Sequence, residues 1–236
     1  IMVNDQPKIL MIETSTSICS VSLFKAKELL AIVEIEETNA HSSKLSLMIE
    51  EVMEKASLKY SDLNAISVSK GPGSYTGLRI GVSSAKGLAY SLDIPLISIE
   101  TLKILHIACM EKYPNNNTIP MIDARRMEVY SIIYDKEGKE IKNLSADIIE
   151  KGIYEEYLKE DEKYIIIGDG AEKCKDVFAG DKRMVFDSEI KLSSKYMGEM
   201  SLAKYLRGEF EDTAYFEPYY LKNFIAAPSK VKGLYS

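Results

Sequence analysis

Apolar and polar positions in the first part of the chain are spaced as in strands of a mixed sheet. The stretch KILMIETSTSICSVSLFKAKELLAIVEIEE, residues 8–37, contains an apolar run, a Thr/Ser turn, an alternating run and a third strand-like segment. This order predicts a three-stranded meander that opens a mixed sheet. Helical spacing follows over residues 42–56, with Ser42 or Ser43 as the cap and one apolar face: Leu45, Met48, Ile49, Val52, Met53 and Ala56.

The next segments predict a strand, a glycine loop, a helix and a further strand. DLNAISVSKGPGS, residues 62–74, is a strand that runs into the loop, and the helix covers residues 76–92. IPLISIETL, residues 94–102, is a short strand that begins after Pro95.

A similar pattern starts again at about residue 104. After a helix, LKILHIACMEKY, the stretch TIPMIDARRMEVYSIIYDKEGKEI repeats the opening: an apolar run, an acidic residue, a polar turn and an alternating strand. Asp123 stands where Glu13 stands in the first copy. This duplication predicts an α/β fold of two similar lobes, residues 1–103 and 104–192. The helix near residues 194–207, which ends by Gly208, is expected to return to the first lobe, with residues 208–236 as an extension.

The helix after the glycine loop has two adjacent stripes. Leu78, Val82, Ala85, Ala89 and Leu92 form the stripe expected to pack on the sheet. The other is mostly small: Gly77, Gly81, Ser84, Leu88 and Ser91, flanked by Ile80. Glycine inside a helix costs about 1 kcal/mol relative to alanine, and close approach of another helix explains that cost. A helix buried under the second lobe is the alternative.

We therefore expect a docking surface on this helix. Gly77, Ile80, Gly81, Ser84 and Leu88 should face outward, with the helix of residues 42–56 alongside. Leu47 lies on the polar side of that neighbouring helix, so it has no obvious use inside its own lobe.

The composition of the chain argues against a nucleic-acid-binding, membrane-spanning or secreted protein. The 236 residues are 46% hydrophobic and 28% charged, and the net charge of −6 comes without a basic block, which disfavours a large nucleic-acid footprint. No apolar run approaches the ~18 residues of a membrane span, and the first residues lack the apolar segment of a signal peptide. Cys19, Cys109 and Cys174 are odd in number and widely spaced, as in reduced cytoplasmic proteins. We expect a soluble, cytoplasmic protein.

The glycine loop allows two interpretations. GPGSYTG contains Gly71, Gly73 and Gly77 but has neither the Walker A nor the Rossmann spacing. Its glycines and the following helix N-terminus could still hold an anion, with Ser74 and Thr76 beside them. Equally, the loop could be a tight turn without a ligand.

The two strand-end carboxylates are similarly ambiguous. Glu13 and Asp123 could face one cleft and organise Mg²⁺ and phosphate, or each could close its own turn by accepting backbone hydrogen bonds. Arg125 and Arg126 could meet a carboxylate or phosphate there, although a solvated turn is the simpler interpretation.

Other catalytic constellations are missing from the sequence. His41 and His106 are the only histidines and lack helical pairing, so no metal site is predicted. There is no nucleophile elbow, because Tyr75 is the central residue of GSYTG. No catalytic residue is predicted.

Several stretches together resemble the TsaB (YeaZ) family of tRNA threonylcarbamoyladenosine biosynthesis subunits. They run in the family's order from about residue 8 to 222: ILMIETSTSICSVSLF, HSSKL, SKGPGSYTGLRIGVSSAKGLAYSLDIPLISIETL, IDARRMEVYSIIYD, IGDGA and EPYYLK. The resemblance implies the two-lobed actin-like ATPase fold of sugar kinases and heat-shock chaperones. Glu13 replaces the Asp of many members, and the two-histidine metal motif of the catalytic paralogue TsaD is lacking.

The function implied by this resemblance is non-catalytic. The chain would pair with TsaD as a heterodimer and act with the ATPase TsaE, without a cofactor of its own and without a membrane. It would contact tRNA only indirectly or weakly, and it could form a homodimer when alone. The glycine loop would then preserve an ancestral nucleotide-fold geometry. The alternatives are a nucleotide-binding phosphotransferase or ATPase that uses Glu13, Asp123 and the loop, and a peptidase, for which no catalytic set is present.

Overall fold

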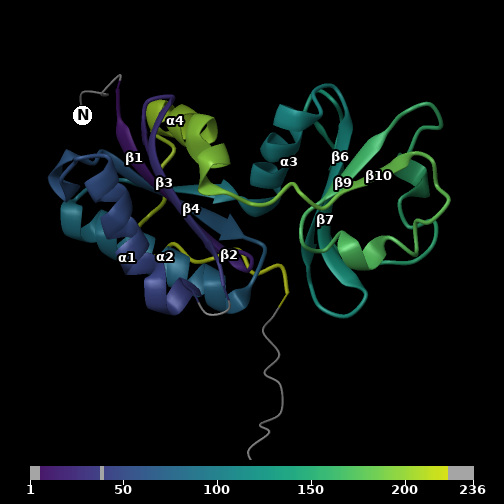
Figure 1. The fold of residues 1–236 in the computed structure, drawn as a ribbon, viewed down its shortest axis with the longest axis horizontal. Helices are drawn as coiled ribbons and strands as arrows, with labels where there is room; N and C mark the ends of the chain where they lie inside the picture. The colour runs from purple at the N-terminus through teal and green to yellow at the C-terminus, as the bar shows by residue number, and fades with distance from the viewer. Residues whose placement is uncertain (1–5, 38–39, 223–236) are drawn as a thin grey trace, which may run out of the picture.

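Two five-stranded mixed sheets form the framework of the protein. The computed structural model describes residues 6–37 and 40–222, so the tail of residues 223–236 lies outside the described residues (Figure 1). The first sheet has the order β3-β2-β1-β4-β5 and the second β10-β9-β6-β7-β8. In each, the first three strands along the chain pair antiparallel and the last two join in parallel. The two sheets therefore share one topology, and the predicted fold class is confirmed.

The strands of the first sheet and the opening strands of the second follow the predicted order, whereas the last strand, β10, was not predicted. Those of the first sheet are β1 (Lys8–Glu13), β2 (Ile18–Lys25), β3 (Glu28–Glu36), β4 (Ala65–Gly71) and β5 (Leu96–Glu100). Those of the second are β6 (Asn117–Asp123), β7 (Glu128–Tyr134), β8 (Glu140–Ile148), β9 (Tyr164–Ile167) and β10 (Met184–Asp187). Each sheet thus begins with a hairpin whose first strand ends in the acidic residue noted from the sequence.

Helices distinguish the two lobes. In the first lobe α1 (Ala40–Lys55) packs on β2 and β3, and α2 (Tyr75–Leu92) packs on β4. A short 3-10 helix, η1 (Tyr60–Asp62), precedes β4. At the corresponding positions the second lobe has only short 3-10 helices, η2 (Glu155–Tyr157) and η3 (Glu172–Cys174). The two lobes therefore have equivalent sheets, but the second lobe has short 3-10 helices where the first has α1 and α2.

A helical segment follows each parallel pair of strands, α3 (Thr101–Lys112) after β5 and η4 (Ser194–Met197) with α4 (Gly198–Arg207) after β10. α3 contacts β4 and β5 of the first sheet and β6, β7 and β9 of the second. η4 and α4 pack against β1, β2 and β5. Buried serine pairs secure this contact, Ser20–Ser194 and Ser67–Ser201, each with 2.7 Å between the hydroxyl oxygens. The last helical segment is therefore built onto the first sheet.

The buried apolar side chains form one cluster under α1 and α2, one inside the second lobe and one shared by both lobes. The shared cluster includes Ile9 and Ile97 of the first sheet, Ile104 of α3, and Ile132 and Ile165 of the second sheet. The two lobes thus bury a common core. None of the helices among the described residues is both long and apolar enough to cross a membrane.

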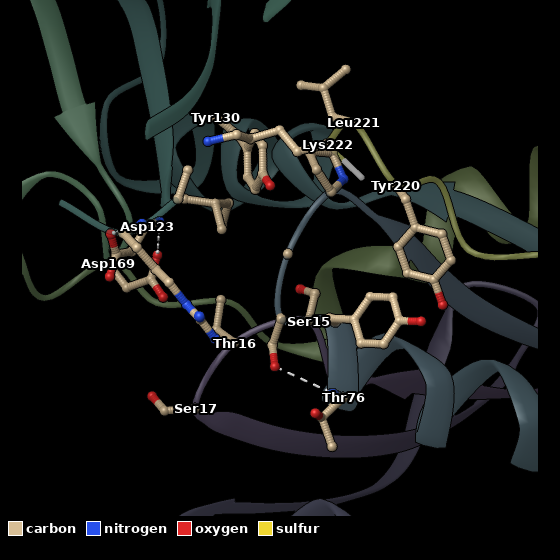
Figure 2. A pocket seen from close by; sticks show the side chains of 18 of the residues that line it. Ser15, Thr16, Ser17, Thr76, Asp123, Tyr130, Asp169, Tyr220, Leu221 and Lys222 are labelled. Carbon is tan, nitrogen blue, oxygen red and sulfur yellow. Dashed lines mark hydrogen bonds between the residues drawn. The ribbon is translucent and has the colours of Figure 1, made fainter. Parts of the chain in front are cut away.

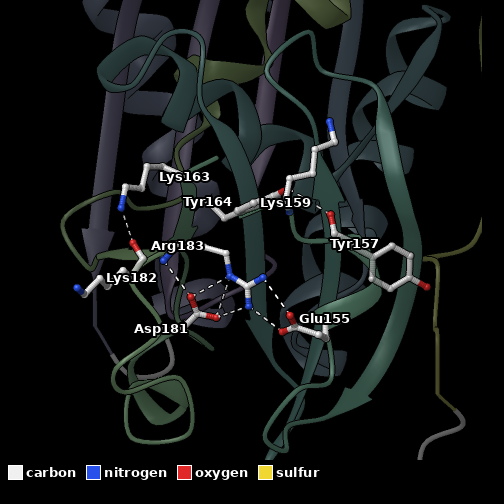
Figure 3. A network of polar contacts seen from close by, with 8 residues as sticks. All are labelled: Glu155, Tyr157, Lys159, Lys163, Tyr164, Asp181, Lys182 and Arg183. Carbon is white, nitrogen blue, oxygen red and sulfur yellow. Dashed lines mark hydrogen bonds and ion pairs between the residues drawn. The ribbon is translucent and has the colours of Figure 1, made fainter. Parts of the chain in front are cut away.

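Polar contacts close the second lobe where helices are missing. Arg183 forms ion pairs with Asp181 and, across 28 residues of sequence, with Glu155 of η2 (Figure 3). Deeper inside, Lys142 pairs with Asp147 at 2.8 Å, and Tyr154 joins them through Ser131. These contacts connect β7, β8, η2 and the loop before β10, in the part of the second lobe that corresponds to the helix-covered side of the first.

Candidate functional site

A cleft of about 570 Å³ lies between the lobes. The turns after β1 and β6, the glycine loop, the loop after β9 and residues 219–222 all contribute to its walls (Figure 2). Hydroxyl groups of Ser15, Thr16, Ser17, Ser74 and Thr76 are prominent on the first-lobe side. The carboxyl ends of the two equivalent first strands therefore meet at one place.

Close packing explains the glycines of the loop. A Cβ at Gly73 would lie 2.4 Å from the carbonyl oxygen of Ser15, and one at Gly77 would lie 2.1 Å from that of Thr14. The Ser74 N–H donates to the Ser15 carbonyl at 2.7 Å, and the Ser74 hydroxyl caps α2 by accepting from the Gly77 N–H. These glycines let the loop lie directly on the turn after β1, so their presence needs no ligand.

Glu13 does not face the cleft. Its side chain is fully buried, and one carboxylate oxygen accepts hydrogen bonds from the N–H of Ser15 at 2.6 Å and from its hydroxyl at 2.5 Å. Burial raises the pKa of Glu13, and the bonds from Ser15 offset part of this effect. Gly71 is also buried and does not line the cleft. The other predicted loop residues do line it: Gly73, Ser74, Thr76 and Asp123.

Asp123 lies in the cleft wall but is held by its own lobe. It forms an ion pair with Lys173 and accepts from the backbone N–H of Arg125 at 2.9 Å. Arg125 and Arg126 both have left-handed backbones, with φ of 70° and 52°, and Arg125 lines the cleft. Glu13 and Asp123 therefore both close turns, and only Asp123 contacts the cleft.

Asp169 is a cleft residue that sequence reasoning missed. Its carboxylate accepts from the Asp123 N–H at 2.9 Å, so the loop after β9 is tied to the turn after β6. The signal in the sequence was the Gly-Asp-Gly after a buried strand, which has the same strand-then-acid form as the first two openings. That similarity could have identified it.

No three His, Cys, Asp or Glu side chains within residues 6–37 and 42–222 are grouped so that they could hold a metal ion. The side chain of His41 lies outside the described residues. His106 is buried against Thr118, and burial followed by the nearby Lys103 lowers its pKa to about 4. Burial raises the pKa of Cys19 and Cys109 to about 12, which leaves these thiols unreactive at neutral pH.

The predicted outward stripe of α2 is partly wrong. Gly77 and Gly81 face inward: a Cβ at Gly81 would lie 2.1 Å from the Thr14 hydroxyl, which itself donates to the Gly77 carbonyl. The cause is the close approach of α2 to the turn after β1. Ile80, Ser84 and Leu88 are half-buried on α2, which contacts α1.

The outermost positions of α2 are different residues. Gly87 has open space around its Cα, Ser83 is exposed, and Tyr90 is 83% exposed. On α1, Leu47 is 61% exposed. Ile80, Ser84 and Leu88 of α2, together with Leu47 of α1, are called the α1/α2 face below.

Similarity to known proteins extends over most of the chain. Residues 28–223 match the family model described as TsaD: tRNA N6-adenosine threonylcarbamoyltransferase. A tRNA threonylcarbamoyladenosine biosynthesis protein TsaB from Buchnera aphidicola subsp. Acyrthosiphon pisum is 32% identical over 70% of this chain and 75% of its own length. The Escherichia coli protein of the same name is 26% identical over 93% and 96%. The solved structure of YeaZ from Pseudomonas aeruginosa has a TM-score of 0.73 at 24% identity, covering 91% of this chain and all of that one.

Proposed function

Because the chain belongs to the TsaB (YeaZ) family, we propose that it acts in tRNA threonylcarbamoyladenosine biosynthesis as a non-catalytic partner subunit. In this proposal it docks onto TsaD in the cytoplasm, works with TsaE, and supports the transferase without contributing an acid, a base or a metal ligand. It touches tRNA only indirectly or weakly.

The observation that carries the non-catalytic role is the position of the strand-end carboxylates. Glu13 is buried and bound to Ser15, while Asp123 is paired with Lys173. A general acid or base must reach a substrate atom within hydrogen-bond distance, and a magnesium site needs several free oxygen ligands. Glu13 has no access to the cleft, so the pair cannot act together there.

The α1/α2 face supports the docking role. Leu47 is a large apolar side chain that is 61% exposed, and the half-buried Ile80 and Leu88 add apolar area on α2. An exposed apolar face bordered by polar positions is typical of an interaction surface. The adjacent positions Glu50 and Glu54 are exposed carboxylates, so the facing surface of the partner should carry positive charge at its rim.

Binding to TsaD from the same organism tests this role. Leu47→Glu should weaken the complex at least tenfold, about 1.4 kcal/mol, because a carboxylate would have to be desolvated at an apolar contact. The melting temperature of the free subunit should stay unchanged. Leu206→Glu is the matched control, since Leu206 is an exposed leucine on α4, away from the α1/α2 face. Equal binding of both variants would place the contact elsewhere on the molecule.

A second arm of the same experiment tests the absence of catalysis. Asp123→Ala should leave reconstituted tRNA modification within about tenfold of the parent, whereas loss of an acid or base typically costs ~10²-fold or more. Titration of Mg-ATP into the isolated protein addresses the phosphotransferase or ATPase alternative. Tight, magnesium-dependent binding together with a large loss in Asp123→Ala would favour that alternative.

A further inference from the structure

The segment after α4 connects three parts of the molecule. Residues 209–222, called the strap below, leave α4 and make a bridge between Glu211 and Leu96 on β5, an edge strand of the first sheet. The strap then passes α2, where the Lys86 ammonium donates to the carbonyl oxygens of Phe216 at 2.7 Å and Ala214 at 3.2 Å. It is the yellow segment that ends between the lobes in Figure 1.

The base of the strap is firmly attached. Phe216 packs against the core cluster under α1 and α2, and the Tyr219 N–H donates to the Lys70 carbonyl at 2.7 Å. The Tyr219 carbonyl lies so close to Gly71 that a Cβ there would approach within 2.7 Å. The backbone up to Tyr219 is thus fixed to the first lobe.

The tip of the strap, residues 220–222, lines the cleft beside Tyr219 and crosses between the lobes (Figure 2). On the first lobe, the ring of Tyr220 lies 4.8 Å from that of Tyr75, at the start of α2. On the second lobe, Lys222 forms an ion pair with Glu128, the first residue of β7. Leu221, between these two contacts, also lines the cleft.

We propose that the tip of the strap is a lid on the cleft, held shut by the Tyr220–Tyr75 contact on one lobe and the Lys222–Glu128 ion pair on the other. Both closing contacts are partly exposed to solvent: Tyr220 is 36% exposed, and the Lys222 and Glu128 side chains are 40% and 22% exposed. Exposed contacts of these kinds change an equilibrium by only a few-fold each. The lid therefore opens readily while its base stays in place, and it controls the access of small solutes to the cleft.

Alkylation of a cysteine placed in the cleft tests this lid. Ala124 lines the cleft, is half-buried and is hydrogen-bonded only through its backbone N–H, so Ala124→Cys introduces a thiol there. The native Cys19, Cys109 and Cys174 are fully buried, so N-ethylmaleimide should modify the new thiol first, as mass spectrometry can verify. In the Ala124→Cys background, Lys222→Glu should raise the alkylation rate about three- to tenfold. Tyr220→Ala should raise it by a similar factor, about a few-fold.

Three controls distinguish opening of the lid from a general effect of net charge on the alkylation rate. The exchanged pair Glu128→Lys/Lys222→Glu should return the rate close to that of the parent. Lys182→Glu makes the same change in net charge on the second lobe at a residue that does not line the cleft, and it should have no effect. High salt should speed alkylation of the parent but not of Lys222→Glu, because the ion pair is screened. An unchanged rate in Lys222→Glu, an equal increase in Lys182→Glu, or no recovery in the exchanged pair would each overturn the proposal.

Discussion

At the scale of single residues, Glu13 shows how a local pattern can leave a role open. A carboxylate at the end of a buried strand is equally suited to a magnesium site and to closing its own turn. In the structure one carboxylate oxygen of Glu13 accepts hydrogen bonds from Ser15, so Glu13 closes its own turn. Its other oxygen has no hydrogen-bond partner among the described residues. The buried carboxylate is therefore only half satisfied.

Glu13→Gln should become more stable relative to the parent as pH rises. The folded-state pKa of Glu13 is raised by burial, so its favourable contribution is complete below the ordinary value of 4.5 and is lost as pH rises through the folded-state pKa. Glutamine stays neutral, can still accept from Ser15, and places an amide donor at the unpartnered position. Urea unfolding of both proteins at several pH values from 4 to 8 measures the difference. A difference in unfolding free energy that does not change with pH would contradict this assignment.

At the scale of one element, α2 shows that the presence of small residues in a helix does not reveal which way each of them faces. The sequence identified small residues on α2 as a sign of close approach, and Gly77 and Gly81 do allow one. The approaching group is Thr14 in the turn after β1, inside the same lobe. Gly87, only six positions further along, faces open space.

Alanine substitutions at these two glycines should have opposite effects. Gly81→Ala should destabilise the protein by about 1–3 kcal/mol, since the new methyl group would displace the Thr14 hydroxyl from the Gly77 carbonyl. Gly87→Ala should stabilise it by about 0.5–1 kcal/mol, because alanine is the better helix former and meets nothing. Thermal unfolding of both variants measures the two shifts. Shifts of the same sign would show that the two glycines do not face opposite ways.

At the scale of the whole molecule, the two lobes have one sheet topology and a shared core. α3 contributes buried side chains to the contact between the sheets, among them Ile104. The lobes thus have separate sheets of the same topology, joined through apolar packing. Neither sheet can lose that cluster without exposing side chains of the other.

Ile104→Ala should therefore destabilise both lobes together. Removing a fully buried isoleucine side chain costs about 2–5 kcal/mol, and each kcal/mol lowers the melting temperature by roughly 2–4 °C in a domain of this size. Calorimetry should show one transition, shifted as a whole. Ile148→Ala is the control, because Ile148 is 68% exposed and its loss should change stability by no more than about 0.5 kcal/mol. Two separate transitions, with only one shifted, would mean that the lobes unfold independently.

The sequence by itself determined the order of strands and helices in the first lobe, the repeated sheet opening and the family. These features depend on residues that are neighbours along the chain, because hydrophobic periodicity and turn chemistry are local. Even the acidic end of β1 and of β6 could be predicted from two similar stretches of sequence.

Only the tertiary structure decided which way the individual groups face. The burial of Glu13, the inward position of Gly81 against Thr14, the place of Asp169 beside Asp123, and the Lys222–Glu128 pair all depend on contacts between distant segments. Gly77 and Thr14 are 63 positions apart, Asp169 and Asp123 46, and Lys222 and Glu128 94. A periodic pattern identifies which residues share a face of an element, but the neighbour that covers that face comes from elsewhere in the chain, and a single sequence carries no local signal for it.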